Sequence, residues 1–297
     1  MKKWYLVPTD FSAAARNAAR YAMQLAHQTG HGVHFFYAFQ PDLDVQSPFL
    51  YDSMAKLQEM WMEKLESWSL ELLGESDKLS RDDIRNEVSI GFAAEEIIRL
   101  SREDENAVIL MGTKGEGGMV GNWLGTVSAK VAQEAYCPVW LIPVDARVRP
   151  LKNILYASSG DAIAEEMIHQ VVRFTRKMEA TLHFVHVHNL QGAPEEKIIE
   201  KIFETLGAGA FGDLSYIVEM INGLDVMKEL NDYVDRNEVD LMISVTHHKS
   251  FWEKMVKHSL TKDLTTHCSI PTLIIHKDDE QSLNQYIDSV TWPLVLS

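Results

Sequence analysis

Residues 125–143 read GTVSAKVAQEAYCPVWLIP, and residues 258–276 read HSLTKDLTTHCSIPTLIIH. The two stretches align without a gap, and each runs from a helix-like pattern through a proline-containing turn into a short apolar strand. Upstream, VILMGTKG at 108–115 lies over LMISVTHH at 241–248, again without a gap. The sequence therefore predicts a duplicated domain.

The spacing between the two copies changes along the chain. Residues 32–40 lie over residues 181–189 at an offset of 181 − 32 = 149, whereas the later blocks are offset by 241 − 108 = 133, so the second copy is sixteen residues shorter in its middle. A length of 297 residues also favours two domains at about 150 residues each. We expect domains over residues 1–148 and 149–277, followed by a tail over 278–297.

Each copy shows the alternation of strand and helix patterns typical of a parallel α/β sheet, with short apolar runs separated by amphipathic helical stretches. Ser12 is placed to cap the first helix, and apolar residues at helical spacing over 54–72 predict another helix. The pattern predicts an α/β fold of two tandem, doubly wound, five-stranded parallel sheets of the Rossmann-like kind. In the first copy the expected strands include residues 4–7, 33–39, 107–112 and 139–144.

Composition narrows the class of protein. The net charge of 28 − 43 = −15 disfavours nucleic acid and anionic membranes as main partners, because both would repel the chain. No apolar run approaches the ~20 residues that span a bilayer, and residues 1–7 do not form a signal-peptide core. Two cysteines, Cys137 and Cys268, make no disulfide framework, so we expect a cytoplasmic protein.

The loop after the fourth strand carries the functional signal. It runs from Gly112 to Ser128, leaving an apolar strand and entering a helix at Gly125 and Thr126. Glycines allow a close backbone approach, and a helix start supplies N–H groups, a hydroxyl and the positive end of the helix dipole. The pattern favours a phosphate site, and a glycine-rich surface loop with an ordinary threonine cap is the alternative. It is neither a Walker loop nor a GxGxxG motif after the first strand.

The spacing of this loop points to a known family. Gly112-x2-Gly115-x9-Gly125-Thr126 matches the G-2x-G-9x-G-(S/T) nucleotide motif of the universal stress protein family, which the chain resembles. VPTDFSAAARNAARYAMQLA at 7–26 looks like the opening strand and helix of that family. TVSAKVAQEAYCPVWLIPV at 126–144 looks like its closing helix, turn and strand. The resemblance covers nearly all of the first copy and, more weakly, the second, so it implies a tandem universal stress protein.

The resemblance also implies an ATP site in the first copy, often with Mg²⁺ bridging the phosphates. Asp10 would hydrogen-bond the adenine or ribose region, Ala38 would pack on the adenine, and the glycine loop would cradle the phosphates with backbone N–H groups. Every position of the motif is filled compatibly. The implied cofactor-binding residues are Pro8, Thr9, Asp10, Ala38, Met111, Gly112, Gly115, Gly125, Thr126 and Val127.

The second copy has lost these residues. The three motif glycines align with Val245, His248 and His258, which cannot allow the same backbone approach. Ser159 replaces Asp10, and only a hydroxyl survives, as Ser259 for Thr126. The second copy is therefore not expected to bind ATP in this manner. Its histidines favour a polar, partly buried surface or pH-sensitive packing. A transition-metal site is the weaker alternative, because their spacing matches no zinc motif, so no metal ligands are predicted. These histidines are His186, His188, His247, His248 and His258, and Asp161 is the carboxylate that a metal site would add.

The sequence leaves several functions open. No nucleophile stands beside a base and no paired carboxylates are evident, so enzymatic activity is uncertain and a slow ATPase is the most it suggests. The favoured reading is a nucleotide-dependent stress regulator with an unidentified protein partner, and the alternative is a scaffold with incidental nucleotide binding. We also expect residues 139–144 and 272–277 to pair antiparallel as an internal pseudo-dimer, with a homodimer possible.

Overall fold

The protein is described by a computed structural model, and its chain divides into two compact units. The first unit ends at Val144, and the second begins at Asp145. The described residues are 2–41, 50–75, 78–103, 106–113, 124–158, 165–188, 213–246, 269–276, 284 and 286–288.

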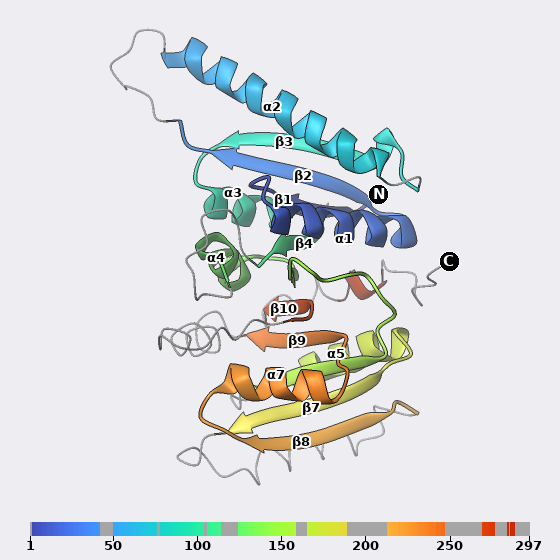
Figure 1. Cartoon of the computed structure of the whole chain (residues 1–297). Helices are drawn as coiled ribbons and strands as arrows, with labels where there is room; N and C mark the ends of the chain where they lie inside the picture. The colour runs from blue at the N-terminus through green and yellow to red at the C-terminus, as the bar shows by residue number, and fades with distance from the viewer. Residues whose placement is uncertain are drawn as a thin grey trace. The chain divides into compact units, whose positions relative to one another are not determined.

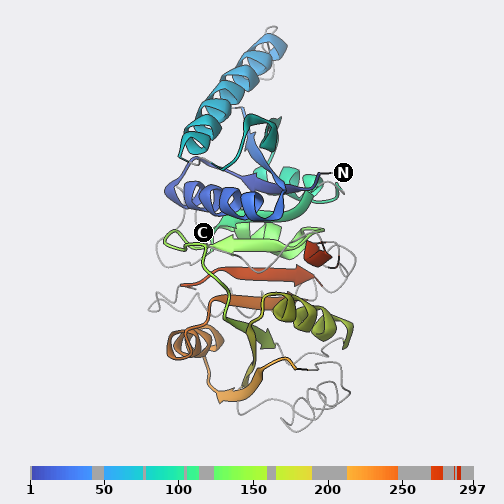
Figure 2. The same cartoon turned by 90° about the vertical axis from the view of Figure 1, so that its right-hand side faces the viewer.

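The first unit is a five-stranded parallel sheet with helices on both faces (Figures 1 and 2). Its strands lie in the order β3-β2-β1-β4-β5, so the chain starts in the middle and winds outward in both directions, as expected for a doubly wound sheet. The elements are β1 (Trp4–Pro8), α1 (Ala13–Thr29), β2 (Gly32–Phe39), α2 (Leu50–Gly74), the 3-10 helix η1 (Arg81–Asp83), β3 (Ile84–Ile90), α3 (Ala93–Leu100), β4 (Asn106–Gly112), α4 (Thr126–Glu134) and β5 (Val139–Ile142).

Helix α1 begins where the sequence predicts. The side chain of Ser12 accepts a hydrogen bond from the N–H of Ala15, which satisfies one of the donors exposed at a helix start. Gly30 ends the helix in the left-handed conformation, with a φ of 72° that glycine adopts without strain. The alanines of α1 bury one face, which lets the helix lie close to β1, β2, β4 and β5.

Helix α2 is held mainly through its C-terminal half. Trp68 is buried edge-on against Phe35 of β2 and Phe11 of the β1–α1 turn, at centroid distances of 5.4 and 5.8 Å. Leu65 and Leu72 are buried as well, whereas Trp61 is only partly buried. Figures 1 and 2 both show the N-terminal end of α2 running away from the sheet. The apolar residues at helical spacing over 54–72 are therefore buried mainly in the second half of the helix.

The second unit has the same architecture. Its strands lie in the order β10-β9-β6-β7-β8, and all neighbouring pairs are parallel. The described elements are β6 (Asn153–Ser158), α5 (Glu165–Lys177), β7 (Thr181–His188), β8 (Tyr216–Asn222), α7 (Val226–Arg236), β9 (Leu241–Thr246) and β10 (Thr272–His276).

Strand registers repeat between the units residue by residue. Pro8 is paired with Phe36 in the first unit, and Ala157 with Val185 in the second, both at an offset of 149. Likewise Gly112–Ile142 corresponds to Val245–Ile275 at an offset of 133. The alignment made from sequence is thereby confirmed, and the fold is two doubly wound domains in tandem.

The register also locates the shortening of the second unit. Glu87 pairs with Phe36, and Glu219 pairs with Val185 at the equivalent place, so the outer strands are offset by 219 − 87 = 132. Seventeen residues are therefore lost before β8, and one is regained between β8 and β9. The loss falls between the second and third strands, where the first unit has its 25-residue helix α2.

The second unit buries a polar cluster between β7 and α7. The Nδ1 atom of His183 lies 2.9 Å from the hydroxyl oxygen of Tyr233, and its Nε2 atom lies 3.4 Å from Oδ1 of Asn153. Burial lowers the pKa of His183, and it raises the pKa of Tyr233 to about 12. Both groups are therefore neutral near pH 7, and the cluster serves packing.

Candidate functional site

Three of the predicted ATP contacts come from three strands and share one face of the first sheet. Pro8 on β1 is the register partner of Phe36, two residues before Ala38 on β2. Leu6, two residues before Pro8, pairs with Ile109, two residues before Met111 on β4. Since side chains alternate along a strand and register partners point the same way, Pro8, Ala38 and Met111 lie on one face near the carboxyl ends of their strands. In doubly wound sheets, ligands bind at this edge.

The β1–α1 turn is fixed by its own side chains. The N–H of Thr9 donates to the carbonyl oxygen of Phe36, and the hydroxyl oxygen of Thr9 accepts from the N–H of Phe11. The carboxylate of Asp10 accepts from the N–H of Ser12 at 3.0 Å and is exposed. Phe11 takes a left-handed φ of 64°, which is strained for a bulky residue. The turn thus holds Asp10 at the carboxyl edge of the sheet.

Phe11 joins this turn to helix α2. Its ring lies 4.9 Å from Tyr37 and 6.2 Å from Trp61 between centroids, and Lys64 lies 4.4 Å above it. Burial, and then the neighbouring carboxylate of Asp10, raise the pKa of Tyr37. These contacts of the Phe11 ring offset the strain of its left-handed backbone conformation.

The loop after β4 is closed at its base by hydrogen bonds. The N–H of Gly125 donates to the carbonyl oxygen of Thr113 at 2.7 Å, and the N–H of Thr113 donates to Ile142 at 3.3 Å. The hydroxyl of Ser128 donates to the carbonyl oxygen of Gly112 at 2.9 Å. The first turn of α4 is therefore tied to the end of β4, beside Met111.

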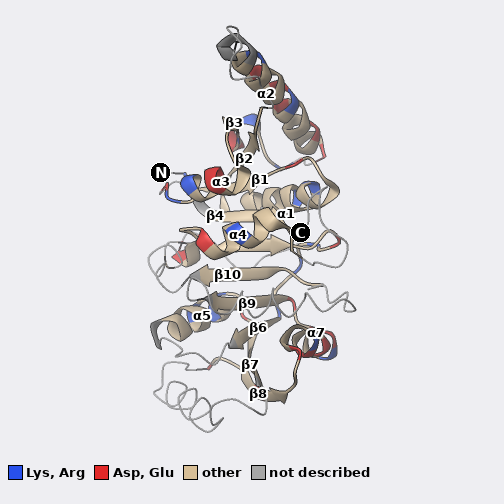
Figure 3. Ribbon diagram, turned by 90° about the vertical axis from the view of Figure 1, so that its left-hand side faces the viewer, with Lys and Arg blue, Asp and Glu red and all other residues tan. Residues whose placement is uncertain are grey.

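The start of α4 presents backbone donors to this edge. Gly125 already uses its N–H on Thr113, and its carbonyl oxygen accepts from Ala129. The N–H groups of Thr126, Val127 and Ser128 have no acceptor among the described residues. No acidic residue lies in the first turn of α4, so the helix start itself carries no negative side chain. In Figure 3 the blue and red ribbon segments of this unit, which mark charged residues, lie mostly on helices, and most of the strand ribbon is tan.

Gly112 has a packing role that the sequence did not reveal. A Cβ atom at this position would lie 2.9 Å from both the backbone carbon and the Cβ atom of Ala14. The glycine therefore allows the start of α1 to approach β4. Its presence has a structural reason independent of any ligand.

The structure thus brings nine of the ten predicted residues to the carboxyl edge of one sheet. The tenth, Gly115, lies outside the described residues, as does the neighbouring Lys114. Thr9, Pro8 and Met111 are buried, whereas Asp10 and Thr126 are exposed.

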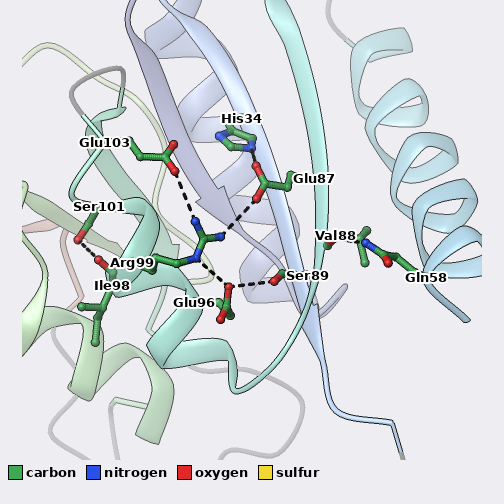
Figure 4. A network of polar contacts seen from close by, with 10 residues as sticks. All are labelled: His34, Gln58, Glu87, Val88, Ser89, Glu96, Ile98, Arg99, Ser101 and Glu103. Carbon is green, nitrogen blue, oxygen red and sulfur yellow. Dashed lines mark hydrogen bonds and ion pairs between the residues drawn. The ribbon is translucent and has the colours of Figure 1, made fainter. Parts of the chain in front are cut away.

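Sequence reasoning missed a polar network on the same face, formed by β2, β3 and α3 (Figure 4). The hydroxyl of Ser89 donates to Oε2 of Glu96 at 2.9 Å, and the same carboxylate binds Nε of Arg99 at 3.0 Å. Arg99 also lies 3.6 Å from Glu87, whose other oxygen lies 3.1 Å from the buried His34. The hydrogen bond to Glu96, above all, raises the pKa of Arg99. The available sequence signal was the alternating polar residues Glu87 and Ser89 of the third strand.

In the second unit, the described residues agree with the loss of the ATP motif. Val245 takes the register position of Gly112 on β9. His186 is buried at the end of β7. Among the described residues no three His, Cys, Asp or Glu side chains gather as a metal site would require. Several residues discussed for the second copy lie outside the described part of the chain. They are Asp161, His247, His248 and His258 of the alternative metal site, the aligned Ser159 and Ser259, and the side chain of His188.

A doubly wound parallel sheet, with a helix start aimed at its carboxyl edge, defines the class of Rossmann-like α/β domains. The sequence profile of the Universal stress protein family matches residues 3–143 and again residues 150–276. The chain therefore belongs to the universal stress protein family and carries two of its domains in tandem.

Individual relatives agree with this assignment. A universal stress protein of Methanocaldococcus jannaschii is 29% identical over 143 residues, which are 47% of this chain and 81% of the relative. One from Thermus aquaticus is 31% identical over 143 residues, covering 48% of this chain and 99% of the relative. The crystal structure of a universal stress protein from Archaeoglobus fulgidus aligns with a TM-score of 0.61 at 16% identity, over 92% of this chain and 96% of that one. This last similarity extends over both units and shows the fold.

Among the described residues, no helix has the length and apolar character needed to cross a membrane.

Proposed function

We propose that the first unit binds ATP and that the protein acts as a nucleotide-dependent regulator through a protein partner. The observation that carries this proposal is the convergence of Pro8, Ala38 and Met111 on one face, beside a helix start whose first three N–H groups have no acceptor among the described residues. The strand face suits a flat apolar base, and the helix start suits phosphates. Membership of the universal stress protein family supports the same assignment.

The phosphate donors follow from the hydrogen bonds on α4. Thr126, Val127 and Ser128 supply backbone N–H groups, while Gly125 forms the base of the loop through Thr113. Among the described residues of α4, the cation Lys130 is paired with Glu95 at 2.5 Å. Backbone amides therefore hold most of the phosphate charge.

An Mg²⁺ ion bound together with the nucleotide would find suitable oxygen ligands at this site. It prefers oxygen ligands and usually keeps several waters, with one or two protein ligands besides the substrate phosphates. The described residues contain no group of three acidic, histidine or cysteine side chains that would form a protein-built metal cage. The Thr126 hydroxyl, at the first position of α4, is the protein oxygen that would serve such an ion.

We also propose a cytoplasmic location, because two cysteines in 297 residues provide no disulfide framework.

The test is the nucleotide released from the freshly purified, denatured protein, identified by mass spectrometry. We expect ATP from the native chain and none from Gly125→Val. The φ of −70° and ψ of 157° at Gly125 suit any residue, so the variant keeps its backbone while a side chain enters the phosphate region. Gly74→Val is the matched control, because a Cβ atom at Gly74 on α2 meets nothing within 4 Å.

Two results would contradict the proposal. The first is a native chain that carries no nucleotide and does not take up added ATP. The second is a Gly125→Val variant that retains as much ATP as Gly74→Val.

A further inference from the structure

Ser89 lies beside the proposed base position. It is the register partner of Ala38 in the parallel pair of β2 and β3. Partners in register point to the same face, so Ser89 shares the face of Pro8, Ala38 and Met111. Ser89 and Ala38 are both partly exposed at the carboxyl edge. A base lying on Ala38 therefore has the Ser89 hydroxyl one strand away at its rim.

The hydrogen of the Ser89 hydroxyl is already used in a hydrogen bond. Ser89 donates to Oε2 of Glu96 at 2.9 Å, and an ionised carboxylate can only accept, so the direction of the bond is fixed (Figure 4). Toward any other group, the Ser89 oxygen therefore offers lone pairs alone.

The carboxylate of Glu96 is held in place from two sides. Arg99 binds it at 3.0 Å and is itself held by Glu87 and Glu103, at 3.6 and 3.5 Å (Figure 4). A Cβ atom at Gly91 would lie 3.0 Å from Cγ of Glu96, so the glycine leaves room for the acid to reach Ser89. The Ser89 acceptor is thereby pre-organised before any ligand arrives.

We propose that Ser89 is a specificity-determining residue of the first unit, which selects nucleotides bearing an amino group at position six of the purine over those bearing a carbonyl. The inference rests on the proposed ATP site. An oxygen that presents only lone pairs accepts a hydrogen bond from an amino group and repels a carbonyl oxygen. Sites built to bond one polar group reject its replacement because a buried partner is left unpaired.

The experiment compares ATP with inosine triphosphate, whose base carries a carbonyl at position six. Dissociation constants are measured calorimetrically on the full chain. We expect the native protein to bind ATP about tenfold or more tightly than inosine triphosphate. Ser89→Ala should weaken ATP binding, leave inosine triphosphate unchanged or better bound, and bring the ratio near one. Ser67→Ala, exposed on α2, is the matched control and should keep the native ratio.

A second variant tests whether the hydrogen bond from Ser89 to Glu96 sets the nucleotide preference. In Glu96→Gln the amide can donate to the Ser89 oxygen, which frees the Ser89 hydroxyl to donate in turn. Inosine triphosphate should then bind several-fold more tightly than it does to the native chain. A purely structural role for Ser89 would change both affinities equally and leave the ratio unmoved.

The outcomes separate the two proposals. A native chain that binds ATP, with an ATP preference that survives in both Ser89→Ala and Glu96→Gln, overturns the role of Ser89 and leaves the ATP site standing. Equal native affinities for the two nucleotides overturn it as well. Binding of neither nucleotide overturns the ATP site and, with it, this inference.

Discussion

Gly112 and Gly125 stand at the two ends of the same loop but have different reasons to be glycine. At Gly112 a Cβ atom would meet the backbone of Ala14 on α1 at 2.9 Å. Gly125 has ordinary extended backbone angles as the N-cap of α4. A glycine motif in the sequence therefore mixes a packing requirement with a proposed binding requirement, and substitutions can separate them.

Gly112→Ala should destabilise the protein by about 1–3 kcal/mol, because the added methyl group overpacks the contact with α1. Gly125→Ala should cost no more than about 1 kcal/mol, the loss expected when an N-cap glycine is replaced by a poorer cap. Urea denaturation followed by circular dichroism measures both. Equal losses, or a larger loss at Gly125, would show that the contact with Ala14 does not limit position 112.

Asp83 provides a pH-dependent test in the first unit. Hydrogen bonds from Lys2, at 2.6 Å, and from Ser80 lower its pKa from the usual 3.8 to about 2. Because the folded pKa lies below the unfolded value, the ionised carboxylate stabilises the fold above about pH 4, and this contribution is lost as pH falls toward 2. Lys2→Met should raise the Asp83 midpoint toward 3.8 in an NMR titration.

The control for this titration is Lys56→Met, which removes a lysine from the exposed face of α2 and should leave the midpoint near 2. A native midpoint near 3.8 would mean that Lys2 does not engage Asp83 in solution.

At the scale of elements, α2 should depend on its C-terminal half. Trp68 is 6% exposed and packs on Phe35 and Phe11, whereas Trp61 is only partly buried. Trp68→Ala should therefore cost about 3–5 kcal/mol in the free energy of unfolding of the first unit. Trp61→Ala should cost less than about 2 kcal/mol, since less apolar area is removed from contact. Denaturant titrations compare the two, and equal costs would indicate that both halves of α2 are anchored alike.

Elements with a strong local signal could be predicted from the sequence. The four apolar runs predicted in the first copy are strands, Ser12 caps α1, and the gap-free repeat corresponds to a duplicated fold with the same register. Features that depend on distant contacts could not be predicted. Phe11 takes a left-handed backbone that its sequence position does not suggest. The bond from Ser89 to Glu96 joins residues whose contact depends on how α3 packs against the sheet.

For the candidate site as well, the positions of residues along the chain could be predicted from the sequence, whereas contacts between distant segments could not. The motif named the residues near the carboxyl edge, because their spacing follows from the strand and helix boundaries. It could not show that the N–H of Gly125 donates to Thr113, which is why the proposed phosphate donors are Thr126, Val127 and Ser128. Hydrogen bonds of a loop base depend on the approach of two chain segments, and spacing alone does not report it.

At the scale of the whole molecule, the two units share a topology and differ at the proposed site. Val245 stands where Gly112 stands, and the second unit is shorter between its second and third strands. The proposed account therefore assigns ATP to the first unit alone. The antiparallel pairing of residues 139–144 with residues 272–277, and any homodimer, remain predictions.

The most direct test of the central claim is the stoichiometry of ATP binding by calorimetry on nucleotide-free, full-length protein with Mg²⁺ present. The account predicts one ATP per chain, no measurable binding by Gly125→Val, and native binding by Gly74→Val. Two ATP molecules per chain, no binding at all, or undiminished binding by Gly125→Val would contradict the assignment of a single nucleotide site to the first unit.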